Sequence, residues 1–310
     1  MATSGSVDYN RTAQQIITRA MRNMGVLGQE QTPNASEMQD GLESLNLMVK
    51  LWQADGINLW KMEEMILWLV EGQTKYTLGT DHAATTWVRT TLSADAALGA
   101  GSLTVSSIAG ISTLDTIGIV LDDGTLQWDT VNGAPTGSTV TLTGTLDSAA
   151  TSGNQVWAYT TKAARPLTVE SPKRRDLVLQ DIPIWRISRQ GYFDTPNKTS
   201  PGRPVNLYYD PQLTGGEVHL WPAPETVNDT ILMTVKMPVE DFDTLPINPD
   251  FPQEWLSALS WGLAEEMCLE YEVPMDRHQR IAAKAGSLRA ILASWDNEGT
   301  SVFFQPDYDA

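Results

Sequence analysis

Two pairs of adjacent glutamates are the residues of this sequence whose chemistry could support hydrolysis. One pair is Glu63 and Glu64, and the other is Glu265 and Glu266. Cleavage of a glycosidic bond needs two carboxyl groups at a defined separation, one of which acts as the acid. Adjacent residues on one helix point about 100° apart, and a chain with 38 acidic residues contains such pairs by chance. We therefore expect no catalysis from them, and a glycan hydrolase remains an alternative.

Other residue types that support catalysis or metal binding are few and scattered. The three histidines, His82, His219 and His278, fall in a predicted loop, a predicted strand and a helix start. The single cysteine, Cys268, lies in an apolar helical stretch and excludes an intrachain disulfide and any multi-cysteine metal site. The sequence contains no phosphate-binding glycine loop and no HExxH zinc motif. We predict a protein that is not an enzyme and that uses no metal or cofactor.

Three tryptophans, Trp87, Trp128 and Trp157, fall in a segment rich in Thr, Ser, Gly and Ala. Tryptophan combines a flat apolar face with a polar edge, which suits stacking on sugars. In small β modules, however, tryptophans that point inward usually form the core. We favour the core role, and a glycan-binding or capsid-decorating protein acting through residues 81–162 remains an alternative.

A basic stretch is the most localised polar feature of the chain. Residues 161–205 carry nine basic and four acidic side chains, whereas residues 206–310 carry five and eighteen. Arginine suits ion pairs at protein interfaces, and basic side chains among aromatic ones also contact phosphate backbones. We predict a subunit interface or a DNA contact, and we favour protein over DNA. The candidate residues are Lys173, Arg174, Arg175, Arg186 and Arg189.

Composition limits the remaining classes of function. The net charge of −17 opposes general binding to nucleic acid, because like charges repel. A hydrophobic fraction of 41% with 19% charged residues is typical of a folded globular chain. The longest apolar run, residues 65–70, is far shorter than the roughly 20 residues of a membrane helix. The start of the chain resembles no secretory signal, so we expect no membrane association.

Hydrophobic spacing predicts two helices near each end of the chain. In the second of them, Met38, Leu42, Leu45, Val49 and Trp52 recur at intervals of four and three residues, which places them on one helix face. The other helices are predicted around residues 16–24, 250–267 and 276–295. Residues 57–80 and 163–240 alternate as strands and loops, and five short strands with turn signals are expected within residues 81–162.

These elements predict an α+β fold. A helical bundle is expected from the N- and C-terminal helices, with a middle β region and an inserted small β-barrel or sandwich. The expected domains are a core of residues 1–80 and 163–295, an inserted β module of residues 81–162, and an extended tail of residues 296–310. That tail contains both aromatic and acidic residues. We expect it to dock on a neighbouring chain, with docking on its own chain as the alternative.

Several stretches of the predicted helices carry helix starts and packing patterns of a recognisable kind. They are TAQQIITRAMRNMGVL at 12–27, TPNASE at 32–37, GLESLN at 41–46, WQADG at 52–56, FPQEW at 251–255 and LAEEM at 263–267. These motifs resemble those of a known family, the head-to-tail adaptor proteins (connectors or tail accessory factors) of short-tailed bacteriophages. The resemblance covers roughly residues 1–80 and 163–310.

The resemblance implies a structural role in the virion, at the junction of head and tail, after assembly in the cytoplasm of the bacterial host. Such adaptors form a homo-oligomeric ring, commonly of twelve copies, that binds the portal protein after genome packaging. The ring gives other tail proteins, a nozzle or fibres, their attachment platform, and the genomic DNA passes through it during ejection without sequence-specific binding. We expect the acidic segment 206–310 to line such a channel. The portal contact is predicted at Val302, Phe303, Phe304 and Tyr308.

Overall fold

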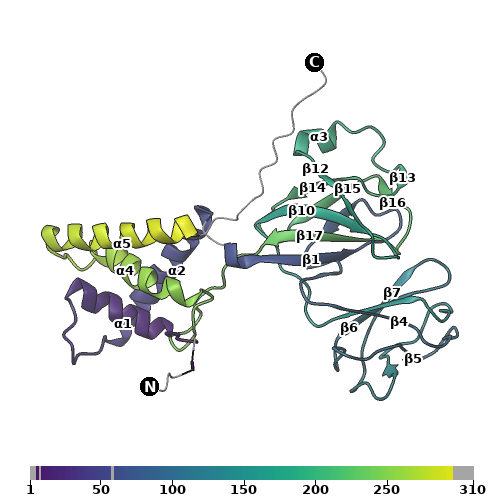
Figure 1. Cartoon of the computed structure of the whole chain (residues 1–310), viewed down its shortest axis with the longest axis horizontal. Helices are drawn as coiled ribbons and strands as arrows, with labels where there is room; N and C mark the ends of the chain where they lie inside the picture. Colours follow the sequence, from purple (N-terminus) through teal and green to yellow (C-terminus); the bar gives the residue numbers. More distant parts are fainter. Residues whose placement is uncertain (1–4, 7, 57–58, 296–310) are drawn as a thin grey trace. The chain divides into compact units, whose positions relative to one another are not determined.

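The computed structural model describes residues 5–6, 8–56 and 59–295, and it divides into two compact units (Figure 1). The helical unit comprises residues 1–61 and 238–310, and the strand unit comprises residues 62–237. In this division, residues 62–80 and 163–237 belong to the same unit as residues 81–162. Each unit is described separately below.

Local capping fixes where the first helices of the helical unit begin. The side chain of Thr12 accepts a hydrogen bond from the Gln15 backbone N–H, and that of Gln15 accepts one from the Thr12 N–H. Asn34 and Glu37 form the same reciprocal pair. Each of these reciprocal pairs, known as a capping box, supplies hydrogen-bond acceptors to backbone N–H groups that have no partner at the start of a helix. The helices of the unit are α1 (Ala13–Met24), α2 (Ala35–Ala54), η1 (Leu59–Lys61), η2 (Gln253–Trp255), α4 (Leu256–Met267) and α5 (Met275–Trp295).

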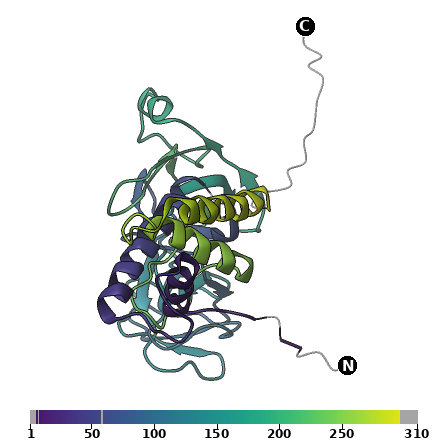
Figure 2. The ribbon, with the colours of Figure 1, turned by 90° about the vertical axis from the view of Figure 1, so that its left-hand side faces the viewer.

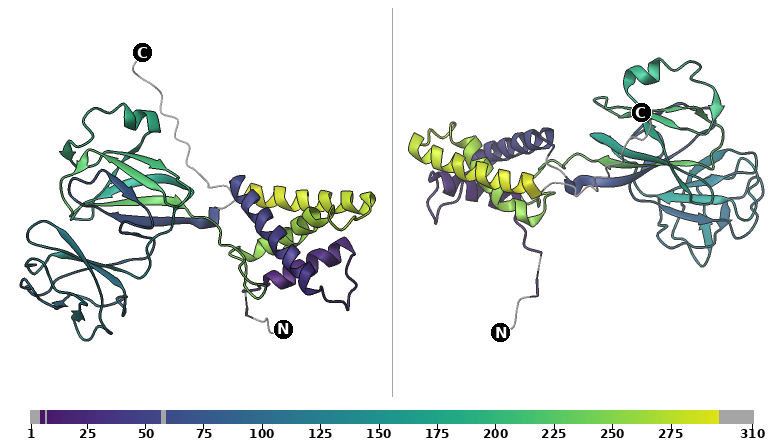
Figure 3. Two further views of the ribbon diagram at one scale, coloured as in Figure 1. Left: turned by 180° about the vertical axis from the view of Figure 1, so that it is seen from behind. Right: turned by 45° about the horizontal axis from the view of Figure 1, so that its top comes forward.

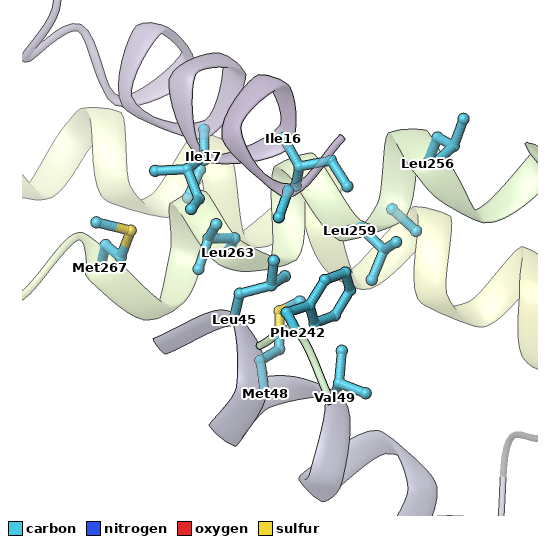
Figure 4. Close-up of a cluster of buried hydrophobic side chains, with 14 of the residues drawn as sticks. Ile16, Ile17, Leu45, Met48, Val49, Phe242, Leu256, Leu259, Leu263 and Met267 are labelled. Carbon is cyan, nitrogen blue, oxygen red and sulfur yellow. The ribbon is translucent and has the colours of Figure 1, made fainter. Parts of the chain in front are cut away.

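Helix α4 packs against α1, α2 and α5, so segments from both ends of the chain share one hydrophobic core. In Figure 4, Ile17 of α1, Leu45 of α2 and Leu263 of α4 converge in this core. The segment before α4 is held to α2 by Asn46, whose side-chain amide donates to the carbonyl of Phe242 and accepts from its N–H. Helix α5 lies beside α4, which Figures 2 and 3 show from different sides.

The strand unit consists of five sheets and one short helix, α3 (Arg189–Phe193). The largest sheet has five strands, two others have four, and the last two are pairs. In spatial order, the five-stranded sheet consists of β11 (Asp181–Pro183), β10 (Thr168–Arg175), β17 (Thr230–Lys236), β1 (Met62–Trp68) and β3 (Ala83–Ala84). One four-stranded sheet consists of β12 (Trp185–Arg186), β14 (Asn206–Asp210), β15 (Glu217–Trp221) and β2 (Lys75–Thr77), and the other of β4 (Val88–Thr91), β9 (Gln155–Tyr159), β6 (Thr116–Val120) and β7 (Leu126–Thr130). The two pairs are β13 (Pro201–Gly202) with β16 (Ala223–Pro224), and β5 (Ser102–Thr104) with β8 (Thr139–Thr141).

The centre of the five-stranded sheet joins distant parts of the sequence. Strand β17 pairs antiparallel with β1 on one side and with β10 on the other, and Met65 lies opposite Met233. Alternate side chains of a strand point to opposite faces, so Met65 and Leu67 enter one core while Ile66 and Trp68 enter another. The first core also contains Leu207, Val218 and Leu220 from β14 and β15.

Residues 81–162 have a hydrophobic core of their own. Ile117 and Ile119 of β6 and Val156 and Ala158 of β9 point into it. The opposite face of the same sheet carries aromatic side chains that pack on Trp68 of β1. This segment is therefore both an independently packed layer and a part of the strand unit.

The predicted fold class, an α+β protein organised around a terminal helical bundle, is wrong. The described residues form seventeen strands and five α-helices, so strands are by far the more numerous elements. The inserted module was predicted as a small barrel or a sandwich, and the barrel is wrong, because the strand order β4-β9-β6-β7 is open and β5 and β8 pair separately. The physical reason is that strands on both sides of residues 81–162 pair with one another and bury a core of their own. They do not form an appendage of the helices.

Two helix glycines give a matched test of the packing in the helical unit. A Cβ at Gly41 would lie 2.6 Å from Cγ2 of the buried, β-branched Ile17, which has little freedom to move, whereas a Cβ at Gly286 would meet nothing within 4 Å. We expect Gly41→Ala to lower the free energy of unfolding by about 1–2 kcal/mol. Gly286→Ala should raise it by about 0.5–1 kcal/mol, through helix propensity alone. Urea unfolding followed by circular dichroism at 222 nm measures both, and equal effects of the same sign would contradict the packing.

Candidate functional site

The two glutamate pairs do not converge on a common point. Glu63 and Glu64 are consecutive residues of β1 and point to opposite faces of its sheet. On α4, Glu266 is exposed, whereas Glu265 is partly buried and burial raises the pKa of its carboxyl group. Neither pair has the geometry of two carboxyl groups facing one bond.

The predicted basic site is largely occupied by contacts within the chain. Arg174 is buried, and its Nε lies 3.5 Å from Oδ2 of Asp229. Arg175 binds both carboxylate oxygens of Asp181, at 2.7 and 2.9 Å. The acidic partners lie on β11, in the case of Asp181, and just before β17, in the case of Asp229, so sequence spacing gave no sign of these pairs. The register of β10 with β11 and β17 creates them.

The other three members of the basic set have different surroundings. Nη1 of Arg186 donates to the backbone carbonyl of Val169 at 2.6 Å and to Glu170 at 3.4 Å. Lys173 is partly buried on β10. Arg189, at the start of α3, is exposed, with its guanidinium carbon 5.6 Å from the ring centre of Phe193. The structure therefore spreads this set over strands and α3, and its role as a subunit interface or DNA contact stays a prediction.

Asp229 is the most buried carboxylate of this region, with 2% of its side chain exposed. Its Oδ2 lies 3.5 Å from Nε of both Arg174 and Arg203. Burial raises the pKa of Asp229, and the two guanidinium groups oppose that rise. A buried carboxylate stays ionised when opposite charges surround it, and removing one member of such a group leaves a buried charge without a counter-charge.

An aromatic cluster joins residues 81–162 to the five-stranded sheet. The ring centre of Trp68 lies 5.0 Å from that of Trp128 and 6.0 Å from that of Trp157. His82 stacks on Trp128 at 4.0 Å, and its Nδ1 lies 2.6 Å from the hydroxyl of Tyr159. Burial, followed by the positive charge of Lys162, lowers the pKa of His82 to about 4. The imidazole is therefore neutral at pH 7.

The tryptophans considered for sugar stacking belong to this cluster. Trp157 is buried, and Trp87 and Trp128 are partly buried against the same core. They form no exposed platform. Trp185 on β12, by contrast, is 76% exposed.

The remaining catalytic candidates are structural. His219 lies on β15 beside Tyr208 and Glu217, and burial lowers the pKa of its ring. Cys268 is buried, and burial raises the pKa of its thiol, which disfavours the reactive thiolate. Within the described residues, no group of three or more His, Cys, Asp or Glu side chains is placed to hold a metal ion. No described helix is long and apolar enough to span a bilayer.

The helical unit presents apolar surface at the end of α5. A groove of about 410 Å³ lies between the start of α4 and the end of α5, and Ala258, Leu288, Ile291 and Leu292 line it. Ile291 is 62% exposed. The ends of α2 and α5 are held together by an ion pair between Asp55 and Arg289. Nearby on α2, Leu47 and Leu51 are exposed one helical turn apart.

The predicted portal-binding residues, Val302, Phe303, Phe304 and Tyr308, lie outside the described residues. In the chain they follow α5, which ends at Trp295 beside the apolar groove. Their assignment stays a prediction, and the groove is the described surface closest to them in sequence.

Comparison with known proteins gives little. No family model matches this chain, and no curated protein matches it. Among solved structures, a partial likeness is found to the Gp54 tailspike of Acinetobacter baumannii bacteriophage AP22, solved in complex with an A. baumannii capsular saccharide. The aligned parts are 17% identical, cover 24% of this chain and 14% of the tailspike, and superpose with a TM-score of 0.21. A likeness this small and short supports no argument about fold or function.

The buried Asp229 and the surface Asp181 provide a matched test of the arginine pairs. We expect Asp229→Ala to lower the free energy of unfolding of the strand unit by about 3 kcal/mol, because Arg174 is left buried without a counter-charge. Asp181→Ala removes a more exposed pair and should cost under about 1 kcal/mol. Urea unfolding followed by tryptophan fluorescence compares the two. Equal losses would show that burial does not set the importance of these pairs.

His82 predicts a loss of stability in mild acid. Because the pKa of His82 is about 4 in the folded chain, whereas a histidine ordinarily has a pKa of 6.5, the unfolded chain binds a proton that the folded chain does not between these pH values. Stability should therefore fall as the pH drops from about 6.5 to about 4. Replacing His82 with Gln should reduce this slope, measured as urea midpoints at pH 7.5 and pH 5. Titration of the three histidine resonances by NMR provides the control, and a His82 signal that titrates near 6.5 would contradict the burial.

Proposed function

We propose that this chain is a structural virion protein of a bacteriophage, a head-to-tail adaptor that works by binding and catalyses no reaction. The observation that supports this most directly is the apolar groove at the end of α5. Exposed apolar surface bordered by polar residues is typical of protein interaction sites. The helix motifs that resemble those of adaptor proteins lie mainly in the helical unit, which carries this groove.

The partner proposed for the groove is the portal protein. The groove lies where α5 ends, and residues 296–310 continue the chain from that point. The tail combines Val302, Phe303, Phe304 and Tyr308 with acidic residues. Large aromatic side chains supply much of the binding energy at protein interfaces. Groove and tail together would form one portal-binding surface, assembled late because the tail gains its contacts only when the portal is present.

Ring formation explains how weak single contacts suffice. A head-to-tail contact between identical subunits closes into a ring when its rotation fits, and each subunit then engages the portal at high effective concentration. In this proposal about twelve copies surround the DNA path and give nozzle or fibre proteins a platform. A net charge of −17 per chain opposes adhesion of the DNA that passes through.

Truncation tests the portal contact. A chain ending at Trp295 should keep its fold, because the described core ends with α5. It should lose assembly on portal rings of the same virus, because the aromatic contacts are gone. Electron microscopy of purified chain mixed with portal rings measures this assembly, and circular dichroism checks the fold.

A matched full-length variant separates the aromatic side chains from the length of the tail. Phe303→Ser combined with Phe304→Ser should weaken assembly by at least about tenfold, because burial of each phenylalanine side chain contributes well over about 1 kcal/mol to binding. Ser301→Ala is the control and should assemble normally. Assembly of the truncated chain at wild-type concentration would refute the tail assignment, and failure of the wild-type chain to bind portal would refute the adaptor function.

A further inference from the structure

The outer face of α1 carries a basic groove. Its volume is about 500 Å³, and an adjoining hollow of about 240 Å³ continues from it over the start of α4 to Trp261. The two share Tyr9, Arg11 and Arg19. The residues that line the groove are Tyr9, Asn10, Arg11, Gln14, Gln15, Thr18, Arg19 and Arg22.

Positive charge in this groove is not balanced within the described residues. Three arginines line it, and no carboxylate does. Nε of Arg11 donates to the hydroxyl of Tyr9 at 2.7 Å, and Arg22 donates to the backbone carbonyl of Gln31 at 3.3 Å. Both acceptors are neutral. The contrast with the strand unit is clear, where Arg174, Arg175 and Arg186 each lie beside a carboxylate.

Helical periodicity explains why these charges gather. The apolar side chains of α1, among them Ile16, Ile17 and Met21, point into the core. Positions 15, 18, 19 and 22 of α1 then share the outer face, since 15, 18 and 22 are three and four residues apart, as are 15, 19 and 22. Arg11 lies just before the N-cap Thr12. Helix α1 contains no acidic residue that could pair with the arginines along this face.

The same unit has an acidic surface elsewhere. Glu37 and Asp40 of α2 and Glu270 after α4 act together on Tyr271, whose pKa rises through burial first and then through these three negative charges. Asp40 and Glu270 are exposed, and no described lysine or arginine lies within ion-pair distance of either. Leu269 adds exposed apolar area beside them. We call Glu37, Asp40 and Glu270 the acidic patch.

We propose that the basic groove of one copy receives the acidic patch of a second copy of this chain. Arginine binds carboxylates with directed, charge-assisted hydrogen bonds. Groove and patch are different surfaces of one subunit, so the contact is head-to-tail and repeats from copy to copy. This contact names the surfaces that join neighbouring subunits of the adaptor proposed above. Its closure into a ring rests on that proposed function.

Charge favours this occupant over nucleic acid. Two chains of net charge −17 repel each other at long range, and at physiological salt that repulsion is screened beyond about 8 Å. Association therefore needs a local contact of opposite charges, which the groove and the patch supply. A DNA duplex would meet the same long-range repulsion with far fewer basic side chains than it has phosphates.

Crosslinking tests the contact directly. Gln14 is exposed in the groove and Asp40 is exposed in the patch, while the native Cys268 is only 1% exposed and gives little background. Gln14→Cys and Asp40→Cys chains are mixed and treated with a short bis-maleimide. We expect mixed dimers, and a ladder of higher species when one chain carries both cysteines. Ser287→Cys, exposed on α5 outside both surfaces, replaces Gln14→Cys as the control and should give roughly tenfold less product.

Charge reversal identifies the interacting groups. Arg19→Glu with Arg22→Glu in the Gln14→Cys chain should reduce the mixed dimer about tenfold, and Glu270→Arg in the Asp40→Cys chain should restore part of it. Circular dichroism confirms that the exposed substitutions leave the helices intact. Yield that is indifferent to both reversals would overturn the proposal. So would loss of binding to a short fluorescent DNA duplex on reversal, with crosslinking unchanged, because the groove would then bind phosphate.

The outcome is separable from that of the adaptor function. If portal-bound rings form but groove and patch do not crosslink in them, the contact is wrong and the adaptor function stands. If mixed dimers form and portal is not bound, the contact stands and the adaptor function is wrong. Absence of both rings and crosslinks, with or without portal, counts against both.

Discussion

Close packing of α4 against α1 and α2 is the constraint on which the binding surfaces depend. A helix of twelve residues such as α1 is marginal in water by itself, so its apolar side must be buried by partners from the other end of the chain. The helices approach closely where side chains are absent: Gly41 faces Ile17, and Gly262 faces Trp52. Once these faces are buried, the arginines of α1, the carboxylates around Tyr271 and the apolar end of α5 are what remains outside.

In the strand unit, the corresponding constraint is the position of β17 between β1 and β10. This strand brings Asp229, just before its first residue, to Arg174. Its neighbour β1 presents Trp68 to the aromatic side chains of β7 and β9. This strand arrangement therefore positions both the buried Arg174–Asp229 pair and the aromatic contact with residues 81–162.

The functional features that remain are surfaces for partners. The chain offers an apolar groove beside the start of its tail, a basic groove on α1 and an acidic patch on the same unit. Sequence reasoning found the basic stretch at 173–189 because it is contiguous, and it missed Arg11, Arg19 and Arg22. The signal was present: Arg19 and Arg22 are three residues apart in a helix without acidic side chains, which places them on one face, and Arg11 lies just before the N-cap of that helix.

The sequence by itself determined the local elements. The starts of α1 and α2 follow from the Thr12–Gln15 and Asn34–Glu37 capping pairs, which act over three residues. Only the tertiary structure decided which segments share a core and which charges are satisfied. Residues 62–68 pair with residues 230–236 across more than half the chain, and no local preference encodes a partner so distant in sequence. Because burial and pairing depend on such partners, the strand register decided which sheet forms and which carboxylates Arg174 and Arg175 contact.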